Sequence, residues 1–97
     1  MDANEHVSTI KKYIKPGDTI THARCMGCIE EHIFAGWDGS WLCGTATADT
    51  IRLNQWDESD EHYVNDISPR NITHINRVPV EHIALLSHQP EGEHTYE

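Results

Sequence analysis

Two dipeptides between residues 26 and 39 constrain the fold of this chain more than any other feature. Asp38-Gly39 is typical of a tight β-hairpin turn, and Met26-Gly27 separates two runs of strand-forming residues. We therefore expect strands over residues 19–25, 28–37 and 40–43. Three consecutive strands joined by two-residue turns form an antiparallel meander, so this stretch predicts a β-rich fold.

A helix is expected before the meander. Val7, Ile10 and Ile14 have helical spacing, and Pro16-Gly17 ends the pattern, which predicts a helix over about residues 3–14. This helix is too short to be stable alone and must pack on the sheet.

The second half of the chain carries weaker strand signals. Residues 50–53 read as a fourth strand and residues 72–75 as a fifth, with a short helical turn expected after Pro79. Residues 57–66 contain five acids in ten positions, which predicts a loop. Together these elements predict a mainly β fold with an N-terminal helix (α+β), built as a small antiparallel five-stranded barrel or roll of the SH3-like kind.

The length of 97 residues limits the chain to one domain with one modest core. We expect that domain over residues 1–86, with the β-meander over about 18–76 and an acidic, flexible tail over 87–97. Only 37% of the residues are hydrophobic, and no run is long enough to span a membrane. The polar N-terminus does not resemble a secretory signal, so a cytoplasmic location is expected.

The net charge of −9 disfavours direct nucleic-acid binding, because the seven basic residues are few and dispersed. A basic or nucleic-acid-binding protein is the partner that this charge favours. The expected contact surface joins one aromatic anchor to the acidic stretch that follows it in the chain. Its residues are Trp56, Asp57, Glu58, Asp60 and Glu61.

A Cys-x-x-Cys pair with a third cysteine and nearby histidines suggests zinc as an alternative. The ligand set would be Cys25, Cys28 and Cys43 with His22 or His32. The meander weighs against it: with both turns in place, Phe34 pairs with Cys43, which then lies roughly 20 Å from the Cys25 and Cys28 pair. The favoured expectation is therefore no metal and no cofactor.

A polar cluster on the first hairpin is a second alternative. If Met26-Gly27 forms the turn, His22 lies opposite Glu31, and this pair is a candidate site for a small ligand or an enzyme. No nucleophile elbow, phosphate-binding glycine loop or nucleotide fingerprint accompanies it. An enzyme is therefore the less favoured expectation.

Three phrases of the chain have a familiar pattern: residues 15–18 (Lys-Pro-Gly-Asp), residues 36–44 around the Asp38-Gly39 turn, and residues 66–76 around Pro69. Together they resemble small uncharacterised accessory proteins of bacteriophages and prophages. The resemblance implies a location in the host cytoplasm and a role in binding or inhibiting a host protein, including by mimicry of nucleic acid. The leading hypothesis is therefore a non-enzymatic, acidic protein-interaction module.

Overall fold

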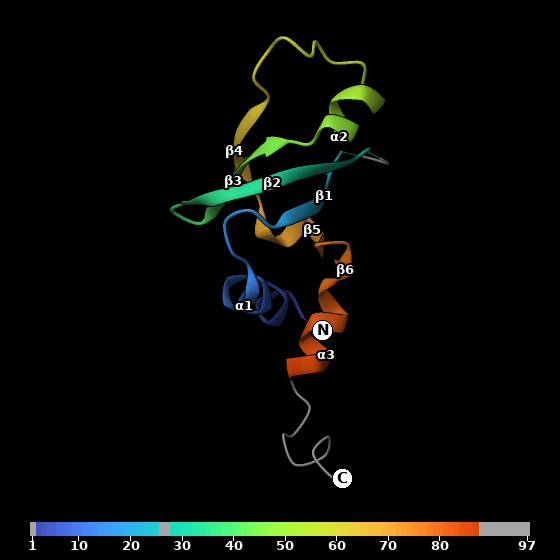
Figure 1. Cartoon of the computed structure of the whole chain (residues 1–97). Coiled ribbons are helices and arrows are strands. Elements are labelled where there is room, and N and C mark those ends of the chain that lie inside the picture. Colours follow the sequence, from blue (N-terminus) through green and yellow to red (C-terminus); the bar gives the residue numbers. More distant parts are fainter. Residues whose placement is uncertain (1, 26–27, 88–97) are drawn as a thin grey trace.

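The computed structural model describes residues 2–25 and 28–87, and one six-stranded antiparallel sheet lies at its centre (Figure 1). The strands are β1 (Thr19–Cys25), β2 (Cys28–Asp38), β3 (Trp41–Ala46), β4 (Tyr63–Ile67), β5 (Ile72–Ile75) and β6 (Val78–Pro79). Their order in the sheet is β4-β3-β2-β1-β5-β6, and all pairs are antiparallel. Within the described residues, β4 and β6 are unpaired edges, so the sheet is open. The predicted α+β class is confirmed, but the prediction of five strands is wrong.

Three α-helices and one turn of 3₁₀ helix accompany the sheet. They are α1 (Ala3–Tyr13), α2 (Ala48–Leu53), α3 (Val80–Ser87) and η1 (Pro69–Asn71). Figure 1 shows α1 and α3 on one side of the strands, and α2 on the other side, near the chain that leads to β4. The predicted helix over residues 3–14 is confirmed as α1, which begins where the Asp2 carboxylate accepts a hydrogen bond from the Glu5 amide.

The core lies between the sheet and the helices α1 and α3. Ile10 of α1 and Ile20 of β1 are fully buried in it, and Trp37 packs against its edge. Alternation along the strands supplies the sheet's share of these apolar side chains from one face. The buried members of the core are Ile10, Ile14, Ile20, Phe34, Leu42, Ile67, Ile72, Ile75 and Val80.

The register of the first hairpin differs from the prediction. Cys25 pairs with Cys28 as expected, but the register shifts between Ala23 and Cys25, so His22 pairs with Glu30. Glu31, the predicted partner of His22, pairs with Thr21 instead. An extra residue in one strand moves every later pair by one position and exchanges the faces of the partner strand. The predicted turn residues 26 and 27 lie outside the described part of the chain.

The second hairpin turns one residue later than predicted. Asp38 pairs with Trp41, so the two turn residues are Gly39 and Ser40, and Gly39 has a φ of 62°. Glycine at the first turn position favours a two-residue hairpin, because it adopts positive φ without strain.

A second register shift follows along the same hairpin. It lies between Phe34 and Gly36, so Phe34 pairs with Gly44 instead of with Cys43 as predicted. The strands approach so closely here that a Cβ on Gly44 would lie 2.5 Å from the Ile33 carbonyl oxygen. Glycine at this position is therefore a steric requirement of the bulged pairing.

Two predicted elements between β3 and β5 are wrong. Residues 50–53 form part of α2 instead of a strand, because Thr47 caps a helix by accepting a hydrogen bond from the Thr50 amide. The predicted acidic loop over 57–66 ends earlier, since Tyr63–Ile67 forms β4. Because β4 is an edge strand, Asn65 and Asp66 remain exposed to solvent. The charge of Asp66 therefore does not prevent β4 from pairing with β3.

The last elements agree better with the sequence. The strand over residues 72–75 is confirmed as β5, and the helical turn after Pro79 is confirmed as α3. The short strand β6 was not predicted; it follows a turn at Asn76 and Arg77, which both have positive φ. Apart from Ser87, the predicted tail lies outside the described residues. Among the described residues, no helix is both long and apolar enough to cross a membrane.

Candidate metal centre

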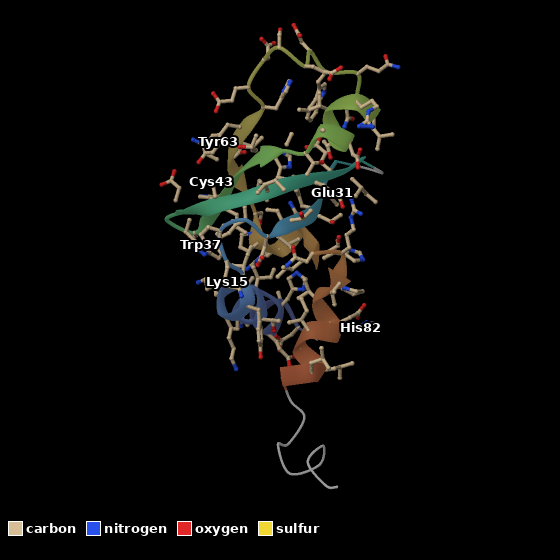
Figure 2. The ribbon with its side chains drawn as sticks, in the orientation of Figure 1. Lys15, Glu31, Trp37, Cys43, Tyr63 and His82 are labelled. Carbon is tan, nitrogen blue, oxygen red and sulfur yellow. The ribbon has the colours of Figure 1, made fainter. Side chains whose placement is uncertain are left out.

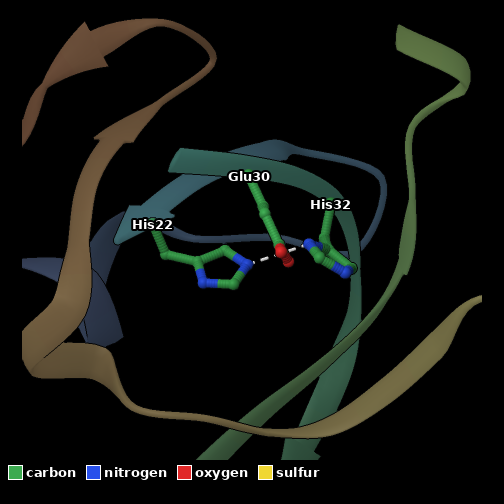
Figure 3. Close-up of side chains that lie close together, drawn as sticks. All are labelled: His22, Glu30 and His32. Carbon is green, nitrogen blue, oxygen red and sulfur yellow. Dashed lines mark hydrogen bonds between the residues drawn. The ribbon is translucent and has the colours of Figure 1, made fainter. Parts of the chain in front are cut away.

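Three ionisable side chains meet on the buried face of the sheet. His22 comes from β1, and Glu30 and His32 come from β2 (Figure 3). The bulge in β1 pairs His22 with Glu30, and His32 lies two residues further along β2, so it shares the face of Glu30. Figure 3 shows the three side chains pointing toward one another.

The cluster is compact and shielded from solvent. His22 Nε2 lies 2.8 Å from His32 Nδ1, and one ligand atom from each of the three residues lies within 4.8 Å of the others. The exposed fractions are 2% for His22, 7% for Glu30 and 0% for His32. Two imidazoles and a carboxylate are therefore held together in a space that excludes most water.

The neighbouring elements fix this stretch of β2. Beyond the end of β3, the amide of Thr47 donates to the Glu31 carbonyl at 3.1 Å, and the Glu31 amide donates to Thr50 Oγ1 at 2.8 Å. Glu31 has no partner residue on β3, and the start of α2 supplies hydrogen bonds to its backbone instead. On the other side of β1, His22 pairs with Ile72 of β5. These contacts hold the backbone of all three cluster residues in place.

A small polar pocket reaches the cluster from the side of β4. Its volume is about 190 Å³, and His22 is part of its wall. Asp66, Ser68 and Asn71 also line it, from the end of β4 and from η1 with its N-cap. The pocket therefore provides a hydrophilic approach to one member of an otherwise buried group.

The structure places Cys43 on another face of the sheet than His22 and His32, the two predicted histidine ligands. Alternation along β3 places Cys43 on the face opposite Leu42 and Gly44, whereas His22 and His32 lie on the core face. Cys43 instead forms a side-chain hydrogen bond with Tyr63, which raises the pKa of the Tyr63 hydroxyl. Figure 2 shows these two residues close together, toward the turn end of β2 and β3. The side chains of Cys25 and Cys28 lie outside the described part of the chain.

The predicted pair of His22 and Glu31 is not formed. Glu31 lies on the other face of β2, where its carboxylate accepts hydrogen bonds from Arg77 at 3.1 and 3.2 Å. The sequence signal for the real cluster was the alternation Glu30-x-His32, which places two potential ligands on one strand face. The bulge in β1 is what places the His22 side chain beside these two residues.

The predicted interaction surface is exposed in part. Its acids Asp57, Glu58, Asp60 and Glu61 are all exposed. Trp56 is only half-exposed, because its ring stacks on His62 with centroids 5.1 Å apart. The aromatic anchor of the prediction is therefore already occupied within the chain, while the acidic residues remain open to a partner.

Fold and site together define a small α+β protein whose antiparallel sheet buries two histidines and a glutamate beside its apolar core. Comparison of the chain with family models, with curated protein sequences and with solved structures found no match. Inferences about its function therefore rest on the geometry of the chain itself.

Proposed function

We propose that this protein binds one divalent transition-metal ion through His22, Glu30 and His32. Two imidazoles and one carboxylate are a ligand set that zinc adopts in proteins and that non-haem iron(II) also adopts. The observation that carries the proposal is the convergence of all three ligand residues within 4.8 Å, each more than nine-tenths buried.

The spacing supports coordination. Zinc lies about 2.0 to 2.1 Å from imidazole nitrogen, so two such nitrogens are about 2.9 Å apart at a right angle and about 3.3 Å apart at the tetrahedral angle. His22 Nε2 and His32 Nδ1 are 2.8 Å apart. A metal ion can therefore replace the hydrogen bond between the two rings if they separate by a few tenths of an ångström and turn so that both nitrogen lone pairs point to the ion. Rotation about the glutamate side-chain bonds then brings the carboxylate into contact.

The environment supports a cation as well. Burial removes water from the Glu30 carboxylate, which strengthens its attraction for a positive ion held by the two rings. The pocket beside His22 supplies a route for the ion and room for a further ligand, such as water or Asp66. Three protein ligands and an open position are typical of a reactive metal, whereas a fourth protein ligand such as Asp66 would close the site as in structural zinc centres.

Zinc titration of metal-free protein by calorimetry and native mass spectrometry tests the proposal. We expect one ion per chain, and we expect Glu30→Gln to weaken its affinity at least about 100-fold, because even the loss of an outer partner of a metal ligand costs 10- to 100-fold. Glu31→Gln is the matched control. It alters the adjacent residue, which lies on the opposite face of β2 beside Arg77, and should leave zinc binding unchanged.

Three outcomes would contradict the proposal. If Glu30→Gln and His32→Gln bind zinc like the parent protein, the ion is held elsewhere. If Cys25→Ser combined with Cys28→Ser abolishes binding, the cysteine set of the sequence analysis holds the ion. Absence of zinc, iron(II) and cobalt(II) binding to the folded parent protein leaves the cluster as a histidine-to-histidine hydrogen bond beside a buried carboxylate, and ends the proposal.

The acidic interaction module stays a prediction that the open carboxylates at residues 57–61 support, although Trp56 is less available than expected.

The finer fold description, an SH3-like roll, is likewise a proposal. Its support is the strand order β3-β2-β1-β5, with β4 joined to β5 through the single turn η1. Neither statement depends on the metal.

A further inference from the structure

A second depression, larger than the pocket beside His22, lies between α1, the turn that joins β2 to β3, and η1. Its volume is about 460 Å³, which falls in the range of small-molecule sites. Helix α1 contributes residues at positions 4, 7, 8 and 11, a spacing that forms one stripe of a helix. Ile10, the fully buried core residue of α1, does not line the depression.

The charge of this groove is opposite to that of the whole chain. Lys11 and Arg70 line it, and none of its nine lining residues is acidic, although the chain carries a net charge of −9. Among the described residues, no carboxylate lies within 4.0 Å of the side-chain nitrogens of Lys11 or Arg70. Both cations are therefore available to an anion that enters the groove.

The groove also offers a ring surface and hydroxyl groups. Trp41 is 48% exposed at the groove, which is unusual for so large an aromatic side chain. Ser8, Ser40 and Ser68 are further lining residues, and serine hydroxyls donate hydrogen bonds to anionic oxygens. An indole face, two cations and several hydroxyls fit an aromatic ring joined to an anionic group.

We propose that this groove binds an aromatic anion of the size of a nucleoside monophosphate. The ring lies against Trp41, and the anionic group lies between Lys11 and Arg70. A nucleic-acid strand is disfavoured because its many phosphates meet the net negative field of the rest of the surface, whereas a single phosphate or carboxylate meets only the local positive charge. The proposal does not depend on the metal centre.

The test follows the indole N–H signal of Trp41 by NMR while adenosine monophosphate is added in the presence of EDTA, which excludes phosphate binding through a metal. We expect a saturable shift of the Trp41 signal, with a Kd tighter than about 1 mM. Adenosine and inorganic phosphate, each lacking one half of the ligand, should bind at least about 10-fold more weakly. Indole-3-acetate, an aromatic carboxylate, tells whether the groove requires phosphate or accepts any anion on a ring.

Charge-reversal variants supply the matched comparison. Lys11→Glu and Arg70→Glu should each weaken adenosine monophosphate at least about 10-fold. Lys12→Glu changes the net charge equally, but Lys12 lies over the Tyr13 ring outside the groove, so this variant should bind like the parent protein. Trp41→Ala, which removes the NMR probe and is therefore measured by calorimetry, should lose the preference for adenosine monophosphate over phosphate.

The proposal is overturned if neither adenosine monophosphate nor indole-3-acetate shifts the Trp41 signal saturably. It is also overturned if Lys12→Glu weakens binding as much as Lys11→Glu, which would indicate a general charge effect, or if inorganic phosphate binds as tightly as adenosine monophosphate. Zinc titration of the Lys11→Glu variant separates this proposal from the metal site, because zinc binding should be unchanged there.

Discussion

Glu30 and Glu31 are neighbours in the sequence with opposite surroundings. Glu30 is 7% exposed and lies with two histidines, whereas the Glu31 side chain is 19% exposed, lies on the opposite face of β2 and accepts hydrogen bonds from Arg77. Chemically the two residues are identical, so position on the strand alone separates a candidate ligand from a surface ion pair.

Asp57 offers a test of electrostatics at the scale of one residue. Its carboxylate accepts hydrogen bonds from the Ser59 hydroxyl at 2.7 Å and from the Ser59 amide at 2.9 Å, and these bonds lower the pKa of Asp57. We expect Ser59→Ala to raise that pKa toward the ordinary value of an aspartate, as measured by the NMR titration of the carboxyl carbon. Ser8→Ala, on α1, should leave it unchanged.

The sign of the linked stability effect follows from the direction of the shift. Because the pKa of Asp57 is lower in the folded chain, its stabilising contribution is present above the unfolded pKa and is lost as the pH falls through the folded pKa. A pKa of Asp57 that is the same in the parent protein and in Ser59→Ala would contradict this account of the turn.

At the scale of elements, β2 and β3 approach each other closely beside His32. The ideal Cβ position on Gly44 lies 2.5 Å from the Ile33 carbonyl oxygen and 3.4 Å from the His32 Cβ. A side chain at Gly44 must therefore push the two strands apart next to the candidate metal centre.

We expect Gly44→Ala to lower the free energy of unfolding by at least about 2 kcal/mol, because both contacting atoms belong to the well-packed part of the sheet. Gly36→Ala is the matched control in the same hairpin, since a Cβ there has no neighbour within 4 Å. Urea unfolding of both variants measures the difference. Equal stability of the two variants would show that β3 can shift without loss.

At the scale of the whole molecule, the proposed metal binding would be linked to folding. His22, Glu30 and His32 come together only when β1 and β2 pair in the bulged register, so an unfolded chain presents no such site. A ligand that binds only the native state stabilises it, by about 2.7 kcal/mol when its concentration is 100 times its Kd.

We therefore expect zinc at that concentration to raise the melting temperature by about 10 to 20 °C, given about 4 to 8 °C per kcal/mol for a domain of this size. Differential scanning calorimetry of the metal-free protein, with and without zinc, measures the shift. The Glu30→Gln variant should show a much smaller rise. A melting temperature that zinc does not raise in the parent protein would contradict the linkage.

The sequence predicted those parts of the fold that local chemistry controls. The spacing of Val7 and Ile10 and the stop at Pro16-Gly17 located α1, and glycine at position 39 located the second hairpin to within one residue. Pro79 located the start of α3. Each of these signals acts over a few residues, so it is readable without knowledge of the rest of the chain.

The candidate site depended on contacts between distant segments. The bulge between Ala23 and Cys25 is set by how β1 meets both β2 and β5, and it alone exchanges Glu31 for Glu30 beside His22. Helix α2, in residues predicted as a strand, combines both kinds of contact, because its Thr47 cap is local and the bond that its Thr50 accepts from the Glu31 amide reaches β2. Periodicity and turn residues thus determined which elements form. Only the packed sheet determined which side chains face one another, because a shift of one residue exchanges the two faces of a strand.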